Sequence, residues 1–126
     1  MGASRGRRSL GDEVRLRHML DAARKAKELS QGKEVGKLEP YSETALALTR
    51  LLEILGEAAG RISPELQTRH PEVPWRDVSD TRNRVIHEYF DVDMEVVRSI
   101  VEDDLPSLAR QLEVVIKGVA NKPERG

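Results

Sequence analysis

The stretch SETALALTRLLEILGEAAGRIS, residues 42–63, decides the fold class of this 126-residue chain. Its apolar residues recur three and four positions apart, which places them on one face of an α-helix. Ser42 is a suitable N-cap, and Ser63 followed by Pro64 is typical of the start of another helix, so this helix should end near Arg61. The apolar positions are Leu48, Leu51, Leu52, Leu55, Ala59 and Ile62. Such a helix needs apolar partners elsewhere in the chain.

Three other segments have the same helical spacing. They are residues 12–30, 75–89 and 94–119, and in the last of these the run DDLP, residues 103–106, predicts a kink or a fresh helix start near Pro106. No segment alternates apolar and polar residues with a period of two, and no hairpin signal such as Asn-Gly is present. We therefore predict an all-α protein, an antiparallel helical bundle of four to five main helices with a kink near Pro106.

The length suits a single domain with one core. We expect the bundle to span residues 12–120, between a flexible basic N-terminal extension, residues 1–11, and a frayed C-terminal tail, residues 121–126. The first 33 residues hold nine Lys or Arg against four Asp or Glu, although the whole chain has a net charge of −1. This basic region either contacts a polyanion such as RNA or is simply solvated surface.

Composition argues against several kinds of site. The chain has no Cys, which rules out disulfides and thiolate chemistry and argues against a zinc site. No apolar run approaches the roughly 20 residues of a membrane span, and the basic start MGASRGRR lacks the apolar block of a signal peptide. We expect a cytoplasmic protein that does not contact a membrane.

The stretch RNRVIHEYFDVD, residues 82–93, concentrates residue types that are rare in a chain with one Phe, two Tyr and three His. On the predicted helix, Arg82 falls within about 40° of the apolar stripe, whereas Asn83 and His87 share a neighbouring face. A guanidinium in that position must find acceptors, because burying an unpaired charge costs on the order of several kcal/mol.

Two interpretations of these side chains remain open. In the structural one, Arg82 pairs with a carboxylate of the bundle, Tyr89 is a core ring and His87 interacts with a helix C-terminus. In the functional one, Arg and His cleave RNA: the imidazole moves the proton of a 2′-hydroxyl, the guanidinium offsets the charge of the phosphorane, and neither step needs a metal. In both, Phe90 packs in the core, and residues 91–93 end this helix and cap the next one.

The octapeptide RNRVIHEY, residues 82–89, matches the R-x-x-x-x-H-x-Y signature of the HEPN superfamily. The sequence around it, PEVPWRDVSDTRNRVIHEYFDVDMEVVRSIVEDDLPSL, and the preceding LLEILGEAAGRIS resemble the characteristic blocks of HepT toxins from HepT/MntA toxin–antitoxin pairs. The resemblance covers roughly residues 43–115. It implies a helical bundle that forms a homodimer around the motif helix.

The resemblance also implies a metal-independent endoribonuclease that needs no cofactor and leaves a 2′,3′-cyclic phosphate and a 5′-hydroxyl. In that family picture His87 is the general acid or base, Arg82 contacts the scissile phosphate, and Asn83 orients the site or binds phosphate. Tyr89 would be the off-switch, because the partner MntA, a minimal nucleotidyltransferase, neutralises the toxin by transferring AMP to the motif tyrosine.

Helical geometry sets a problem for this site. Residues five apart on an ideal helix point about 140° away from each other, so Arg82 and His87 of one chain would not grip one phosphate. Either a two-fold dimer brings the two residues together from different chains, or the helix loosens near His87. The rival to the enzyme is a non-catalytic HEPN module that docks a nucleotidyltransferase or binds nucleotides.

Overall fold

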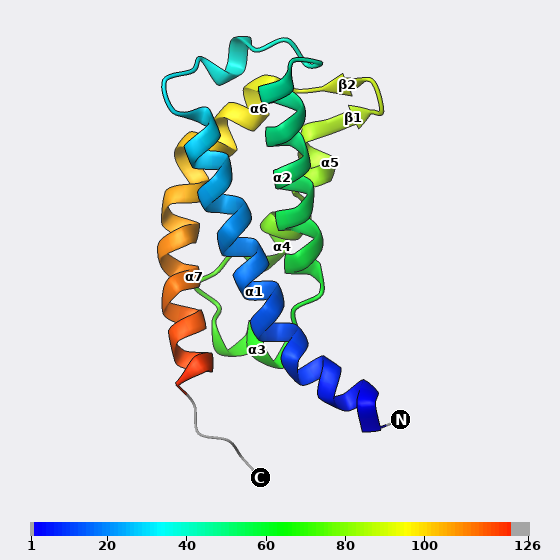
Figure 1. Ribbon diagram of the computed structural model, residues 1–126, viewed down its shortest axis with the longest axis vertical. Coiled ribbons are helices and arrows are strands. Elements are labelled where there is room, and N and C mark those ends of the chain that lie inside the picture. Colours follow the sequence, from blue (N-terminus) through cyan, green and yellow to red (C-terminus); the bar gives the residue numbers. More distant parts are fainter. Residues whose placement is uncertain (1, 122–126) are drawn as a thin grey trace.

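The computed structural model describes residues 2–121, and the side chains of residues 11–121. Three long helices lie side by side: α1 (Gly2–Ser30), α2 (Glu43–Gly60) and α7 (Leu105–Ala120) (Figure 1). The chain rises along α1 and returns along α2 and α7, so that both pack antiparallel to α1 (Figure 1). This confirms the predicted all-α antiparallel bundle. The shorter elements are η1 (Val35–Lys37), α3 (Pro64–Arg69), α4 (Trp75–Ser79), α5 (Thr81–Val85), β1 (Ile86–Glu88), β2 (Asp91–Val92), α6 (Met94–Ser99) and η2 (Ile100–Asp104).

One apolar core joins these helices. Side chains from α1, α2, α6 and α7 meet in it, as do those of the loop and short helices that pack over the bundle. The largest fully buried members are Leu16, Met19, Val35, Leu48, Leu52, Leu55, Leu66, Val73, Val85, Val97, Leu105 and Leu112. Within the part of the chain that the structure describes, none of the helices has the length and apolar character to cross a membrane.

The ends of α2 match the prediction from its sequence. The Ser42 side chain accepts a hydrogen bond from the backbone N–H of Ala45 at 3.2 Å, and α2 ends at Gly60 with Arg61 as its C-cap. Ser63 caps α3 in the same way, with Pro64 in the first turn. Local capping chemistry therefore fixes both boundaries.

The N-terminal helix is longer than its apolar periodicity indicates. It begins at Gly2, ahead of the Asp12 expected as its start, and the side chains of residues 2–10 are not described. Asp12 instead links α1 to α3, because its carboxylate accepts hydrogen bonds from the backbone N–H of Ser63 at 3.0 Å and from the Ser63 hydroxyl at 2.6 Å. The flexibility of residues 1–11 stays a prediction. The predicted frayed tail, residues 121–126, lies outside the described residues except for Asn121.

The interruption expected near Pro106 takes the form of a wider helical turn. The π-helical segment η2 lies between α6 and α7, and Pro106 occupies the first turn of α7. A proline has no N–H to donate and its ring collides with the carbonyl four residues earlier, which here belongs to Glu102 in η2. Widening the helix at that point accommodates the ring and keeps the chain helical.

The prediction of a third helix over residues 75–89 is wrong for its second half. The chain forms two short helices, α4 and α5, separated at Asp80, and then leaves the helical path to form the antiparallel hairpin β1–β2. Ile86 pairs with Val92 in the hairpin, and the backbone N–H of Asp93 donates to Val85 O at 2.8 Å. The helix thus loosens before His87, which is the second of the two arrangements left open by the sequence.

Candidate active site

Gly56 sets how closely the motif segment lies on α2. An ideal Cβ at this position would be 3.0 Å from the carbonyl oxygen of Val78 and 3.4 Å from that of Ser79. Only a residue without a side chain allows the end of α4 to approach the α2 backbone this closely. Thr81, which opens α5, is buried in the same contact. The next residue along the chain, Arg82, is thereby held beside α2.

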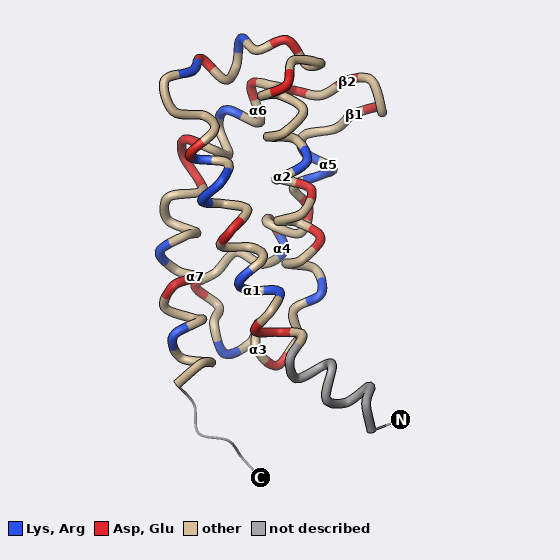
Figure 2. Tube along the Cα trace, viewed as in Figure 1, with Lys and Arg blue, Asp and Glu red and all other residues tan. Residues whose placement is uncertain are grey.

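Arg82 forms an ion pair across this contact. Its Nε lies 3.3 Å from Oε2 of Glu53 on α2, and 61% of its side chain is exposed. The predicted place of Arg82 within the apolar stripe is therefore wrong, because the break at Asp80 changes the helical phase on which that projection depended. Arg50 approaches the same carboxylate at 3.8 Å. Figure 2 shows the basic residues of α5 beside acidic residues of α2.

His87 faces a different carboxylate. Its Nε2 lies 3.5 Å from Oδ2 of Asp93, and 52% of the His87 side chain is exposed. Asp93 also caps α6, since its Oδ1 accepts the backbone N–H groups of Glu95 and Val96, each at 3.1 Å. The hydrogen bond from Val96 is the main cause that lowers the pKa of Asp93 below its usual value; burial opposes it, and His87 and Glu95 add to the lowering.

Asn83 and Arg84 turn toward neighbouring acidic side chains. The Asn83 amide donates to Oδ1 of Asp80 at 2.7 Å, across the break between α4 and α5. Arg84 lies 3.7 Å from Asp104 of η2. Asn83 therefore supports the backbone that carries Arg82, and its side chain is exposed.

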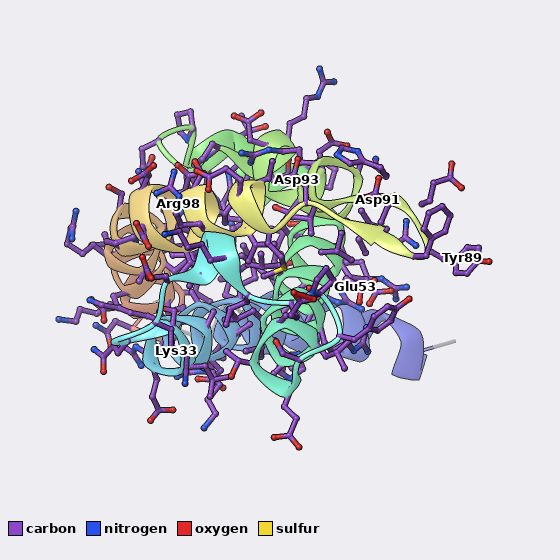
Figure 3. All side chains as sticks on the ribbon, turned by 90° about the horizontal axis from the view of Figure 1, so that it is seen from above. Lys33, Glu53, Tyr89, Asp91, Asp93 and Arg98 are labelled. Carbon is purple, nitrogen blue, oxygen red and sulfur yellow. The ribbon has the colours of Figure 1, made fainter. Side chains whose placement is uncertain are left out.

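The two aromatic residues of the motif stretch form the tip of the hairpin. Tyr89 is 90% exposed and projects away from the bundle (Figure 3). Phe90 is 56% exposed and packs edge-on against Tyr89, with ring centroids 5.2 Å apart. The expected core position of Phe90 is wrong, because the residue lies in the turn between β1 and β2 and not on a helix.

A groove of about 300 Å³ lies between the start of α2 and the hairpin. Arg82 and Tyr89 line it, whereas His87 does not. Arg82 and His87 of one chain therefore do not line this groove together. The groove is lined by Pro40, Tyr41, Leu46, Thr49, Glu53, Arg82, Ile86, Tyr89, Phe90 and Val92.

A larger cavity, of about 630 Å³, opens between α4, α5 and α7. Four acidic residues and one arginine, Arg84, line it, and neither Arg82 nor His87 does. Among the described residues, no group of three or more His, Asp or Glu side chains is arranged to hold a metal ion. The chemistry-bearing side chains of the motif thus lie at the hairpin end of the molecule.

A match to a family model covers the groove, the motif segment and the hairpin, and it shows the family of the chain. The family model described as "Ribonuclease HepT-like" matches residues 19–115, which include α2, the motif segment, the hairpin and most of α7. The chain belongs to the HepT-like ribonuclease family. The fold is accordingly that of a HEPN bundle, and the resemblance of residues 43–115 to this family is confirmed.

Individual relatives support the same membership. A protein of Thermococcus cleftensis named "Probable ribonuclease HepT" is 41% identical over 75 residues, which make up 60% of this chain and 68% of that protein. Two proteins of Methanocaldococcus jannaschii that carry RNase names are 38% identical over 69 residues and 30% identical over 82 residues. These matches cover 55% and 65% of this chain, and 63% and 68% of those proteins. No solved structure matches this HepT-like chain.

Sequence reasoning missed two carboxylates that hold the motif side chains. Glu53 occurs within the recognised LLEILGEAAG block but carries no sign that it faces Arg82. Asp93 was expected as a helix cap, which is confirmed, but its contact with His87 depends on the hairpin. A residue six positions from His87 becomes its neighbour only when the chain folds back on itself.

Proposed function

We propose that this HepT-like protein is a metal-independent endoribonuclease that cleaves RNA with Arg82 and His87. The observation that carries the proposal is the exposure of both side chains at one end of the molecule, each beside a carboxylate. An exposed guanidinium binds phosphate oxygens through its planar set of donors, and an imidazole transfers protons near neutral pH.

The reaction uses the 2′-hydroxyl of the substrate as its nucleophile. The 2′-oxygen attacks the adjacent phosphorus while the bond to the 5′-oxygen breaks, which yields a 2′,3′-cyclic phosphate and a 5′-hydroxyl. His87 accepts the proton of the 2′-hydroxyl or donates one to the leaving 5′-oxygen. Arg82 stabilises the phosphorane as its negative charge grows. Since these groups supply both proton transfer and charge, no metal has to take part.

The carboxylates and the asparagine prepare these two groups. Asp93 orients the His87 ring through the contact between Oδ2 and Nε2 at 3.5 Å. Glu53 holds Arg82 at the edge of the groove. Asn83 fixes the segment through Asp80 and has an exposed side chain that can reach a neighbouring phosphate.

A homodimer completes the site in this proposal. Arg82 lines the groove beside α2, and His87 lies outside that groove against Asp93. In a two-fold dimer each chain offers the same surface, so that Arg82 of one chain meets His87 of the other at two equivalent clefts.

We also propose that the protein is the cytoplasmic toxin of a HepT/MntA-type pair. A nucleotidyltransferase antitoxin would transfer AMP from ATP to the hydroxyl oxygen of Tyr89, with release of pyrophosphate and of the phenolic proton. The near-complete exposure of Tyr89 at the hairpin tip supports this, because the acceptor hydroxyl must enter the active site of another enzyme. A bulky anionic adenylate beside Arg82 would repel RNA phosphates.

RNA cleavage in EDTA tests the proposed function. We expect the wild-type protein to cut RNA under these conditions and His87→Ala to be slower by about 10²- to 10⁴-fold, the usual contribution of a general acid or base. His18→Ala is the matched control, because His18 is exposed on α1 and is not part of the motif segment, so its loss should leave the rate unchanged. An inactive wild type, or equal rates for wild type and His87→Ala, would refute the catalytic role.

A further inference from the structure

The groove beside Arg82 is lined by several aromatic and apolar side chains that are exposed to solvent. Tyr41 at its rim is 73% exposed and Leu46 is 50% exposed, and the exposed Phe90 lines the opposite, hairpin side. Ile86 and Val92, which are half-buried, also line the groove. Exposed aromatic and apolar side chains gathered around one groove make it a candidate binding site.

A guanidinium lies in the same groove. Among the described carboxylates, Arg82 has an ion-pair contact only with Glu53, whose Oε2 lies 3.3 Å from Nε, and 61% of the Arg82 side chain is exposed. A guanidinium has five N–H donors, so it can bind a phosphate while it keeps this contact. Flat aromatic rings beside one anion-binding group match a nucleotide unit, in which a base is attached through its sugar to a phosphate.

We propose that this groove binds one nucleobase of the RNA substrate, stacked on Tyr41 and Phe90, next to the phosphate that Arg82 contacts. The inference rests on the proposed role of Arg82 as a phosphate-binding residue and adds a base subsite to it. Stacking on aromatic rings tolerates every base, because each base has a π-face. The subsite therefore confers a requirement for a base at one position and little preference for its identity.

Size and charge favour a base over a second copy of the chain as the occupant. A groove of about 300 Å³ lies at the small end of ligand-sized pockets. A protein segment that filled the groove would bury Arg82 and Glu53, whereas an RNA strand supplies a phosphate to the exposed side of Arg82. Base stacking and phosphate binding then occur together along one strand.

Equilibrium binding of uncleavable oligonucleotides tests the subsite. Fluorescence anisotropy would follow single-stranded 2′-O-methyl oligonucleotides, which have no nucleophile, and matched versions with one abasic site placed at each position in turn. For the wild-type protein, we expect one position at which loss of the base weakens binding roughly 5- to 150-fold, as for a stacked base. Tyr41→Ala should weaken binding of the intact strand to a similar degree. This variant should bind the strand with the abasic site at that position as tightly as it binds the intact strand.

Two control variants show whether an effect of Tyr41→Ala comes from the loss of its aromatic ring. Tyr41→Phe keeps the stacking surface and should bind like wild type. Val114→Ala removes an equally exposed apolar group from α7, far along the chain from the groove, and should also have no effect. Circular dichroism of each variant verifies that its helix content is retained.

Three results would overturn the subsite. They are an abasic profile without a sensitive position, a Tyr41→Ala variant that keeps the full abasic penalty, and a Tyr41→Ala variant that changes from dimer to monomer on light scattering. The last would make the groove an interface between copies. Because the readout is binding and not cleavage, failure of the proposed ribonuclease activity would be seen separately, in the RNA cleavage assay.

Discussion

At the residue scale, Asp93 combines two tasks in one side chain. One oxygen caps α6 and the other faces His87. Asparagine caps a helix about as well as aspartate but carries no charge. The two tasks can therefore be separated by substitution.

We expect Asp93→Asn to melt close to the wild-type temperature while it cleaves RNA more slowly, with the loss in kcat and not in KM, because RNA binding does not depend on Asp93. Asp93→Ala should lose the cap as well and be less stable by about 0.5–2 kcal/mol at pH 7. Thermal melts and steady-state cleavage rates measure both effects. If Asp93→Asn cleaves at the wild-type rate, the contact with His87 does not contribute to catalysis.

Stability against acid provides a second test of Asp93. The folded protein lowers the pKa of this carboxyl below its usual value of 3.8, so its stabilising effect is fully present above that value. The effect is lost as the pH falls through the lowered pKa. The difference in unfolding free energy between wild type and Asp93→Ala should therefore be constant from pH 7 to about pH 5 and shrink toward pH 3. A difference that grows in acid would contradict this assignment.

Tyr89 is the residue on which the proposed regulation depends. With the cognate nucleotidyltransferase and ATP, we expect mass spectrometry to find AMP on the peptide that contains Tyr89 and not on the one that contains Tyr41. Tyr89→Phe keeps the ring but has no acceptor oxygen, so it should keep its ribonuclease activity after the same treatment. Neutralisation of Tyr89→Phe to the wild-type extent would show that Tyr89 is not the switch.

At the element scale, the predictions were right for helices in which a capping residue and the apolar spacing indicate the same start. The prediction was wrong for residues 75–89, where only the spacing indicated a helix. Ser42 and Ser63 mark helix starts by chemistry that acts within three residues, and both are confirmed. Residues 75–89 have helical spacing, yet after Val85 the chain forms a hairpin in which Ile86 and Val92 are half-buried and whose turn contains no Gly or Asn. Periodicity alone cannot separate a short helix from a strand that turns its apolar residues to the same core.

Two wrong predictions about the site follow from treating the segment that forms the hairpin as part of a helix. The helical projection put Arg82 in the apolar stripe and Phe90 in the core, and both are exposed. The types of residue in the motif were recognisable from sequence, because they depend on identity and spacing. Their partners Glu53 and Asp93 were not, because they depend on how α2 and α6 pack against the hairpin.

The contact between α2 and α4 offers a test at this scale. Gly56→Ala would place a methyl group 3.0 Å from a backbone carbonyl that cannot rotate away. We expect a loss of about 1–3 kcal/mol in unfolding free energy, as for other overpacked contacts, and slower RNA cleavage because Arg82 is displaced. Urea denaturation measures the loss of unfolding free energy, and steady-state rates measure the loss of RNA cleavage.

Gly118→Ala is the control for this substitution. Gly118 lies on α7 with no neighbouring atom within 4 Å of an added Cβ. Alanine is favoured over glycine inside a helix by roughly 1 kcal/mol, so this variant should be somewhat more stable and fully active. A Gly56→Ala protein as stable as Gly118→Ala would show that the close approach is not required.

At the scale of the whole molecule, the bundle is determined by the apolar faces of its long helices. Leu16 and Met19 of α1, Leu52 of α2 and Leu112 of α7 all reach the same core. This explains why the fold class was predictable from spacing alone. The homodimer around the motif segment was implied by the resemblance to HepT proteins, and it stays a prediction.

Arg82 lines the groove and His87 does not, and for this reason we propose a cleft built from two chains. Mixing two inactive variants, Arg82→Ala and His87→Ala, tests whether such a cleft forms. After subunit exchange, half of the dimers are mixed, and each mixed dimer holds one cleft with both residues intact, so RNA cleavage should recover to about a quarter of the wild-type rate. A mixture as inactive as either variant alone, with exchange verified by mass spectrometry, would contradict the claim.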